Sequence, residues 1–98
     1  MLYKLYRSKH KSSDPVYDDS FSEFNKLYKK YDVKVVGGGT NIENPQEEYF
    51  MTVYKNKAHY EETVSKLRND PKYQELTKKL EDRRDSIEVI TLESEYEL

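Results

Sequence analysis

The 98-residue sequence contains no cysteine and no tryptophan, and only three glycines and three prolines. The absence of cysteine excludes disulfide frameworks, thiol nucleophiles, and zinc or iron–sulfur sites that need thiolate ligands. No segment has the roughly 20 consecutive apolar residues of a membrane span, and the N-terminal segment MLYKLYRSK lacks the apolar core of a signal peptide. These absences predict a cytoplasmic protein with no membrane partner.

Charged side chains are abundant but nearly balanced, with 17 Lys and Arg against 19 Asp and Glu. Aliphatic residues are few by comparison, whereas tyrosine occurs ten times. A chain of this length is expected to form one domain, which we place at residues 1–98. Because plain hydrophobic residues are scarce, the domain would gain stability from burying part of its surface against a second subunit.

Apolar periodicity and turn signals predict seven elements in the order β-α-β-β-α-α-β. Strands are predicted at residues 1–9, 33–36, 49–54 and 86–98. A helix is predicted to begin at a capping box formed by Ser20 and Glu23, a second after the cap Asn56, and a short third one after the cap Asp70. The glycines at 37–39 predict a bend or bulge that lets a helix or ligand approach the strand.

This order is typical of the ferredoxin-like α+β fold, in which helices cover one face of a four-stranded antiparallel sheet. The strand at 49–54 has apolar side chains on both faces, so the open face of the sheet also needs cover. A second copy would supply it, and we therefore predict a homodimer through the open sheet face, a dimeric α/β barrel. Segment 1–11 is basic and segment 85–98 is acidic, which predicts cross-strand charge pairs.

The segment YFMTVYKNKAHYEETVSKLRNDPKYQEL, residues 49–76, resembles a strand-helix-helix unit of the dimeric α+β barrel superfamily. The resemblance is to its NIPSNAP-like members, and it extends to antibiotic-biosynthesis-monooxygenase-like proteins. The matching features are Tyr54, the polar cap Asn56, and the turn Asp70-Pro71-Lys72-Tyr73. The resemblance implies the dimeric α+β barrel fold. It also implies one of two functions, either ligand binding without turnover or cofactor-independent oxygenation. The Asn-Trp-His set of the haem-degrading branch is missing, so we expect neither haem nor another cofactor.

The candidate site is a mostly apolar cavity between helices and sheet, suited to a small apolar or aromatic ligand. Tyr3, Phe50, Thr52 and Tyr54 are expected to project into it from neighbouring strands, and His59 to reach it from the following helix. Tyr54 or His59 could orient a substrate or accept a proton. In the alternative interpretation, the rings only fill the core and the subunit interface, and His59 is a surface residue.

Two function classes follow from these residues. The first is ligand binding or regulation without turnover, and the second is a cofactor-independent monooxygenase acting on a small aromatic or enolisable substrate. His10 and His59 do not have the spacing of metal ligands, so no metal site is predicted.

An RNA-recognition module is a further alternative, because it shares the order β-α-β-β-α-β. Tyr49, Phe50 and Tyr54 would then be the rings that stack on bases. The acidic pI near 5.7 and the absence of the Gly-aromatic signature argue against a nucleic-acid partner.

Overall fold

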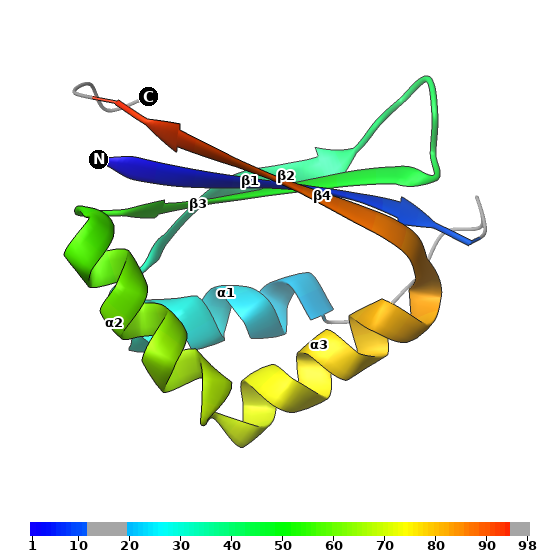
Figure 1. The fold of residues 1–98 in the computed structure, drawn as a ribbon. Helices are drawn as coiled ribbons and strands as arrows, with labels where there is room; N and C mark the ends of the chain where they lie inside the picture. The colour runs from blue at the N-terminus through cyan, green and yellow to red at the C-terminus, as the bar shows by residue number, and fades with distance from the viewer. Residues whose placement is uncertain (12–19, 95–98) are drawn as a thin grey trace.

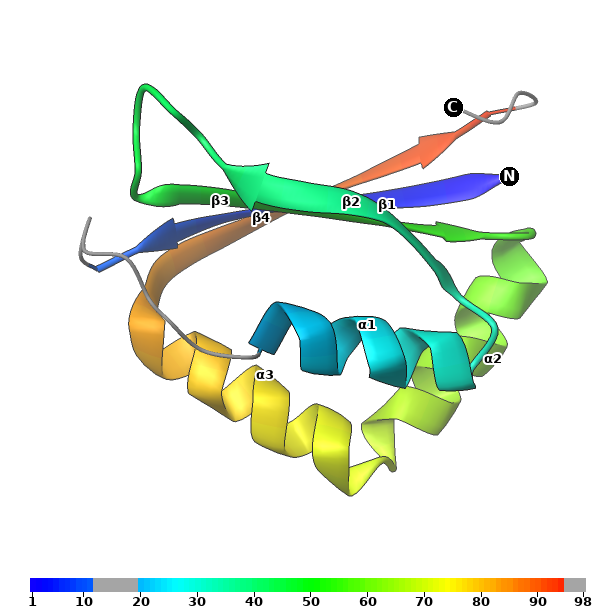
Figure 2. The same ribbon diagram turned by 180° about the vertical axis from the view of Figure 1, so that it is seen from behind.

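The computed structural model describes residues 1–11 and 20–94. Its elements are β1 (Leu2–His10), α1 (Ser20–Lys30), β2 (Lys34–Thr40), β3 (Glu47–Tyr54), α2 (Lys57–Arg68), α3 (Pro71–Arg83) and β4 (Arg84–Glu93). The four strands form one antiparallel sheet in the order β2-β3-β1-β4. In the described part of the chain all three helices lie on one face of this sheet, as Figures 1 and 2 show. The predicted ferredoxin-like α+β fold is confirmed.

The two later helices begin where the sequence predicts. The Asn56 side chain accepts a hydrogen bond from the His59 amide at 2.8 Å, and Asp70 Oδ1 accepts one from the Lys72 amide at 2.9 Å. The third helix, Pro71–Arg83, is not short: its 13 residues make it the longest of the three. The reason is local, because good helix formers without a breaker continue to its end.

The other predicted ends differ by a few residues. The last strand begins at Arg84, two residues before the predicted start, and its predicted extension over residues 95–98 lies outside the described residues. The capping role of the Ser20 side chain also lies outside what the structure describes. Glu23, its predicted partner, forms an ion pair with Lys72 of α3, with 2.9 Å between Oε1 and Nζ.

The three glycines are part of β2 and pair with β3 rather than following the strand. The register shifts between Val35 and Gly37, which confirms the predicted bulge. A Cβ atom on Gly38 would lie 2.7 Å from the Tyr49 carbonyl oxygen and 3.0 Å from Cε2 of Phe21. Gly38 therefore lets α1 pack closely against the sheet, as the sequence predicts for this glycine run.

The main core lies between the helices and the covered face of the sheet. Its buried members come from both layers: Leu2, Leu27, Tyr28, Val33, Tyr54, Leu67 and Leu76. Leu76 of α3 is 0% exposed. Two of the seven are tyrosines, so rings with hydroxyl groups take core positions that an aliphatic-rich chain would give to leucine.

The central strand β1 pairs with β3 on one side and with β4 on the other. The predicted pairing of opposite charges is confirmed at Arg7 and Glu88, whose Nη2 and Oε2 atoms are 2.5 Å apart. Lys4 on the same strand donates to the Thr91 hydroxyl at 2.6 Å. These exposed contacts specify the register of β4 more than they add stability.

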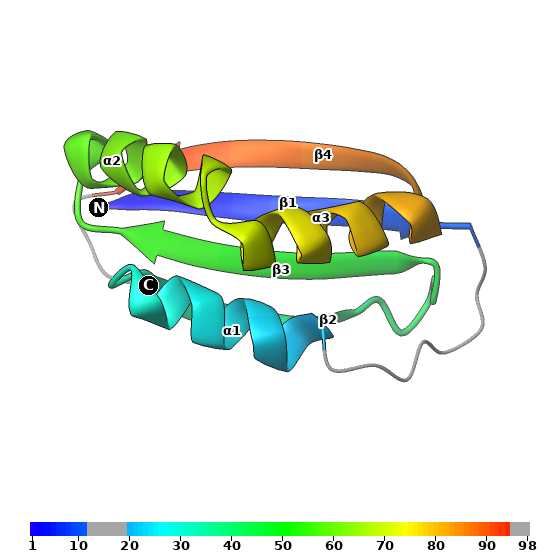
Figure 3. The ribbon, with the colours of Figure 1, turned by 90° about the horizontal axis from the view of Figure 1, so that it is seen from below.

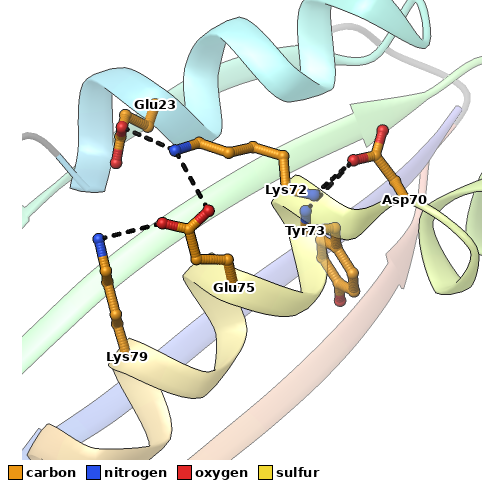
Figure 4. A network of polar contacts seen from close by, with 6 residues as sticks. All are labelled: Glu23, Asp70, Lys72, Tyr73, Glu75 and Lys79. Atoms are coloured by element: carbon orange, nitrogen blue, oxygen red, sulfur yellow. Dashed lines mark hydrogen bonds and ion pairs between the residues drawn. The ribbon is translucent and has the colours of Figure 1, made fainter.

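Helices α2 and α3 follow one another along the sheet, with α1 beside them (Figure 3). Asp70 joins this layer together, because it caps α3 and accepts a hydrogen bond from the Tyr31 hydroxyl at 2.5 Å. That hydroxyl holds the pKa of the Asp70 carboxyl below its ordinary value. Figure 4 shows the adjoining contacts, in which Lys72 of α3 lies between Glu23 of α1 and Glu75.

Candidate functional site

A cavity of about 300 Å³ lies between the sheet and helices α1 and α3. Aromatic rings from both layers form a large part of its wall: Tyr6, Phe21, Phe24, Tyr28, Phe50 and Tyr73. Phe50 of β3 lies at the centre of this group, with its ring centroid 5.6 Å from that of Phe21 and 5.8 Å from that of Tyr28. The volume and the aromatic lining suit a small ring-shaped molecule.

One end of the cavity is polar and charged. Ser8, Thr40, Glu48, Arg83 and Arg84 line it. The sheet register explains this grouping, because Glu48 of β3 is paired with Ser8 on one side and with Thr40 on the other. Arg84 is the first residue of β4 and is paired with His10 at the end of β1. The site therefore has an aromatic body and a polar end.

His10 is buried beside this polar end, with 7% of its surface exposed. Its Nε2 atom lies 2.7 Å from Oε2 of Glu48, whereas its Nδ1 atom is buried and has no hydrogen-bond partner. In the neutral ring that donates from Nε2 to the carboxylate, Nδ1 carries a free lone pair. No role for His10 is predicted from the sequence, because it lies in a polar basic segment and does not have the spacing of a metal ligand with His59. Strand alternation, which places His10 on the same face as Tyr6 and Ser8, was the signal available.

The tyrosine hydroxyls near the cavity remain protonated. Burial raises the pKa of Tyr6 and of Tyr28 far above its ordinary value, and it raises the pKa of Tyr54 to about 12. Near them, the hydroxyl oxygen of the fully buried Thr52 has no hydrogen-bond partner. At neutral pH these tyrosines can donate hydrogen bonds but cannot accept a proton as bases.

The structure separates the ligand-binding residues expected from the sequence. Phe50 lines the cavity. Thr52 and Tyr54 share its face of β3 but lie outside the cavity wall, in the buried part of the domain. Tyr3 lies on the opposite face of the sheet, because it is paired with Val53, and side chains alternate along a strand.

His59 also lies outside the cavity wall. Its Nδ1 atom accepts a hydrogen bond from the Lys55 amide at 3.1 Å, so the ring closes the turn that leads into α2. The same ring packs edge-on against Tyr54, with 5.7 Å between centroids. The structure thus brings His59 and Tyr54 together, but at a place where neither faces the cavity.

The described residues contain neither a metal-binding cluster nor a membrane-spanning helix. Within residues 1–11 and 20–94, no group of three or more His, Asp or Glu side chains is placed to hold a metal ion. None of the helices in these ranges is long and apolar enough to span a membrane.

The rings considered for RNA stacking do not share one face of the sheet. Phe50 and Tyr54 point toward the helices, and Tyr49 points to the open face, where its hydroxyl donates to Glu47 at 2.9 Å. A stacking platform needs several rings on one exposed surface. Of these three rings, β3 therefore presents Tyr49 alone on the open face of the sheet.

Comparison with known proteins gives matches among solved structures. No family model matches the sequence, and no curated protein matches it. Protein Atu4242 from Agrobacterium tumefaciens superimposes with a TM-score of 0.79 at 19% identity, covering 95% of this chain and 92% of its own. An uncharacterized NIPSNAP domain protein from Burkholderia xenovorans gives 0.67 at 16% identity, with coverages of 96% and 94%. SnoaB, a cofactor-independent oxygenase from Streptomyces nogalater, gives 0.64 at 9% identity, with coverages of 99% and 95%.

These similarities define the class of fold. The chain has the ferredoxin-like α+β fold that NIPSNAP and antibiotic biosynthesis monooxygenase structures share over nearly their whole length. The resemblance predicted from residues 49–76 is confirmed at this level. At identities of 9–19% the shared property is the fold, so the chemistry of the cavity has to be argued from its own residues.

Proposed function

We propose that this protein is a NIPSNAP-like protein that binds a small aromatic molecule in the cavity between α1, α3 and the sheet. The observation that carries the proposal is the space of about 300 Å³ whose wall includes aromatic rings from two strands and two helices. Several of these rings contact Phe50, with their centroids 5.6–6.3 Å from its own, and they still leave this space open beside them. Rings that served only as core would close such a space, because protein interiors pack densely. The space is large enough for one or two fused rings.

Filling the cavity tests this proposal. Thr77 of α3 lines the cavity, and Lys78 beside it is exposed on the outer side of the helix. Thr77→Phe should abolish saturable binding of 2-naphthol, measured by calorimetry, whereas the matched Lys78→Phe should bind like the wild type. Circular dichroism checks that both variants are folded. The proposal fails if wild-type protein shows no saturable binding, or if Thr77→Phe binds as well as wild type.

We also propose that two copies pair through the open face of the sheet to form a dimeric α+β barrel, acting in the cytoplasm. The support is a row of apolar side chains on that face, where Leu5 is paired with Met51 on one side and with Ile90 on the other. Ile90 and Leu92 are 38% and 42% exposed. A second copy is the partner that a self-complementary apolar face fits, because two-fold dimers pair one surface with itself.

The strand β4 supplies a matched pair of variants for this dimer. Ile90 points to the open face, and its neighbour Val89, which is 48% exposed, points to the helix side. Sedimentation should show dimers for wild type and Val89→Glu, and monomers for Ile90→Glu. A wild-type monomer at tens of micromolar protein, or dimers of Ile90→Glu as stable as wild type, would contradict the barrel.

A cofactor-independent monooxygenase is the second candidate, favoured by the buried His10 ring and its contact with the more exposed Glu48 carboxylate beside the cavity. A carboxylate-bound imidazole is suited to accept a proton from an enolisable substrate. In this activity the His10 imidazole would accept the proton, a role that the sequence suggested for Tyr54 or His59. Oxygen uptake with phenolic substrates that disappears in His10→Gln, with substrate affinity retained, would establish this activity. Inertness toward such substrates leaves ligand binding alone.

A further inference from the structure

We propose that the ligand of this cavity is an aromatic carboxylate whose anionic group is bound by Arg84. This inference rests on the proposed binding function and names the chemical class of its ligand. Arg84 is suited to the role because of where it lies. It follows the last turn of α3 directly, begins β4, and is half-buried in the polar end of the cavity.

The charges of the cavity wall support an anionic ligand. Among the described lining residues, Glu48 is the carboxylate, and it is already bonded to His10 at 2.7 Å. Arg83 has a partner of its own. Arg84 therefore brings to this end of the cavity a positive charge that the Glu48 carboxylate does not contact.

The Arg84 side chain has no hydrogen bond or ion pair with any residue in 1–11 or 20–94. Arg7 provides the contrast, because its guanidinium lies 2.5 Å from Glu88 on the exposed side of the same strand pair. A half-buried guanidinium has lost part of its hydration, and a carboxylate restores this by accepting two parallel hydrogen bonds. The free donor groups of Arg84 thus match the geometry of a carboxylate.

The rest of the ligand follows from the other end of the cavity. The ring centroids of Phe21 and Tyr28 each lie within 6 Å of the Phe50 centroid, and this arrangement favours a planar aromatic body. The volume of about 300 Å³ limits that body to about two fused rings. A bare inorganic anion would leave the aromatic surface exposed to water, so it fits the site less well than an aromatic acid.

Two probes of nearly equal shape separate the carboxylate from the ring: 2-naphthoate and the neutral ketone 2-acetonaphthone. We expect wild-type protein to bind 2-naphthoate more tightly than the ketone in calorimetry. Arg84→Gln should lose about 10- to 100-fold in affinity for 2-naphthoate, the range of charge-assisted hydrogen bonds, with ketone binding unchanged. Arg68→Gln, an exposed arginine of α2 outside the cavity, should bind both probes like wild type.

A second variant at the same position shows whether a loss of affinity in Arg84→Gln comes from misfolding at the helix-strand junction. Arg84→Lys keeps the charge but loses the planar pair of donors, so its affinity for 2-naphthoate should lie between those of wild type and Arg84→Gln. Equal binding of both probes by wild type, or unchanged 2-naphthoate affinity in both Arg84 variants, overturns this inference and leaves the binding function standing. Failure of both probes to bind wild type overturns the binding function as well.

Discussion

The approach of α1 to the sheet depends on the missing side chain of Gly38, and replacing this residue by alanine tests that dependence directly. The new Cβ would lie 2.7 Å from the Tyr49 carbonyl oxygen, a backbone atom that cannot rotate away, and 3.0 Å from the Phe21 ring. The same substitution at Gly37 or Gly39 meets nothing within 4 Å. None of the three has a positive φ angle, so alanine is allowed by the backbone at each position.

The expected sizes follow from two opposing effects. Alanine in place of glycine within a strand gains about 0.5–1 kcal/mol, because less backbone entropy is lost on folding. Overpacking against fixed atoms costs about 1–3 kcal/mol. Gly38→Ala should therefore lower the free energy of unfolding by about 1 kcal/mol, whereas Gly37→Ala and Gly39→Ala should leave it equal or slightly raised. In a domain of this size, 1 kcal/mol shifts Tm by about 4–8 °C.

Thermal and urea unfolding, followed by circular dichroism, measure these differences. Each variant is compared at two protein concentrations, so that a contribution from subunit association appears as a concentration dependence. The reasoning is refuted if Gly38→Ala is as stable as Gly37→Ala and Gly39→Ala. A lower stability of all three would mean that the strand, rather than the contact with Phe21, requires glycine.

Three further predictions concern the core, a helix cap and alkaline pH. Leu76→Ala, at a fully buried position, should lose about 2–5 kcal/mol of stability in urea unfolding, and a loss below 1 kcal/mol would contradict the described packing. Asn56→Ala should lose about 0.5–2 kcal/mol because the cap of α2 is removed, while Asn56→Ser should retain most of it; equal losses in both would refute the capping role. The pKa of Tyr54 is raised to about 12 in the folded state, whereas an unfolded tyrosine titrates near pH 10. The contribution of Tyr54 to stability should therefore be constant below pH 10 and fall between pH 10 and 12, with Tyr54→Phe more resistant to alkali than wild type in circular dichroism.

The order of elements could be read from the sequence because each depends on local signals. Asn56 and Asp70 are capping residues next to apolar periods, and the glycine run marks an irregular strand. The ends were less predictable. Arg83 and Arg84 form a junction where helix passes into strand without a turn residue, so no local signal marks the boundary.

The candidate site was harder to predict because strand β3 is apolar on both faces. Strand alternation places Phe50, Thr52 and Tyr54 on one face of β3. It does not show whether this face or the other is covered by the helices, or on which face Tyr3 of β1 lies. That choice is made by tertiary packing. It also decides that His10 is buried beside Glu48, while His59 is used in a helix-entry turn.

The position of β1 at the centre of the sheet has a consequence for synthesis. Glu88 follows Arg7 by 81 positions, and β4 is the last strand to leave the ribosome, after both β1 and β3. Until then β1 is an edge strand with unpaired backbone groups, which is the kind of surface on which nascent chains aggregate. Lys4, Arg7 and Lys9 are then the charged side chains along that edge. The charges of β1 are therefore suited to limit aggregation of the nascent chain until the acidic strand β4 pairs with β1. Slow translation of residues 84–93 should be tolerated better by wild type than by a chain with these three charges removed.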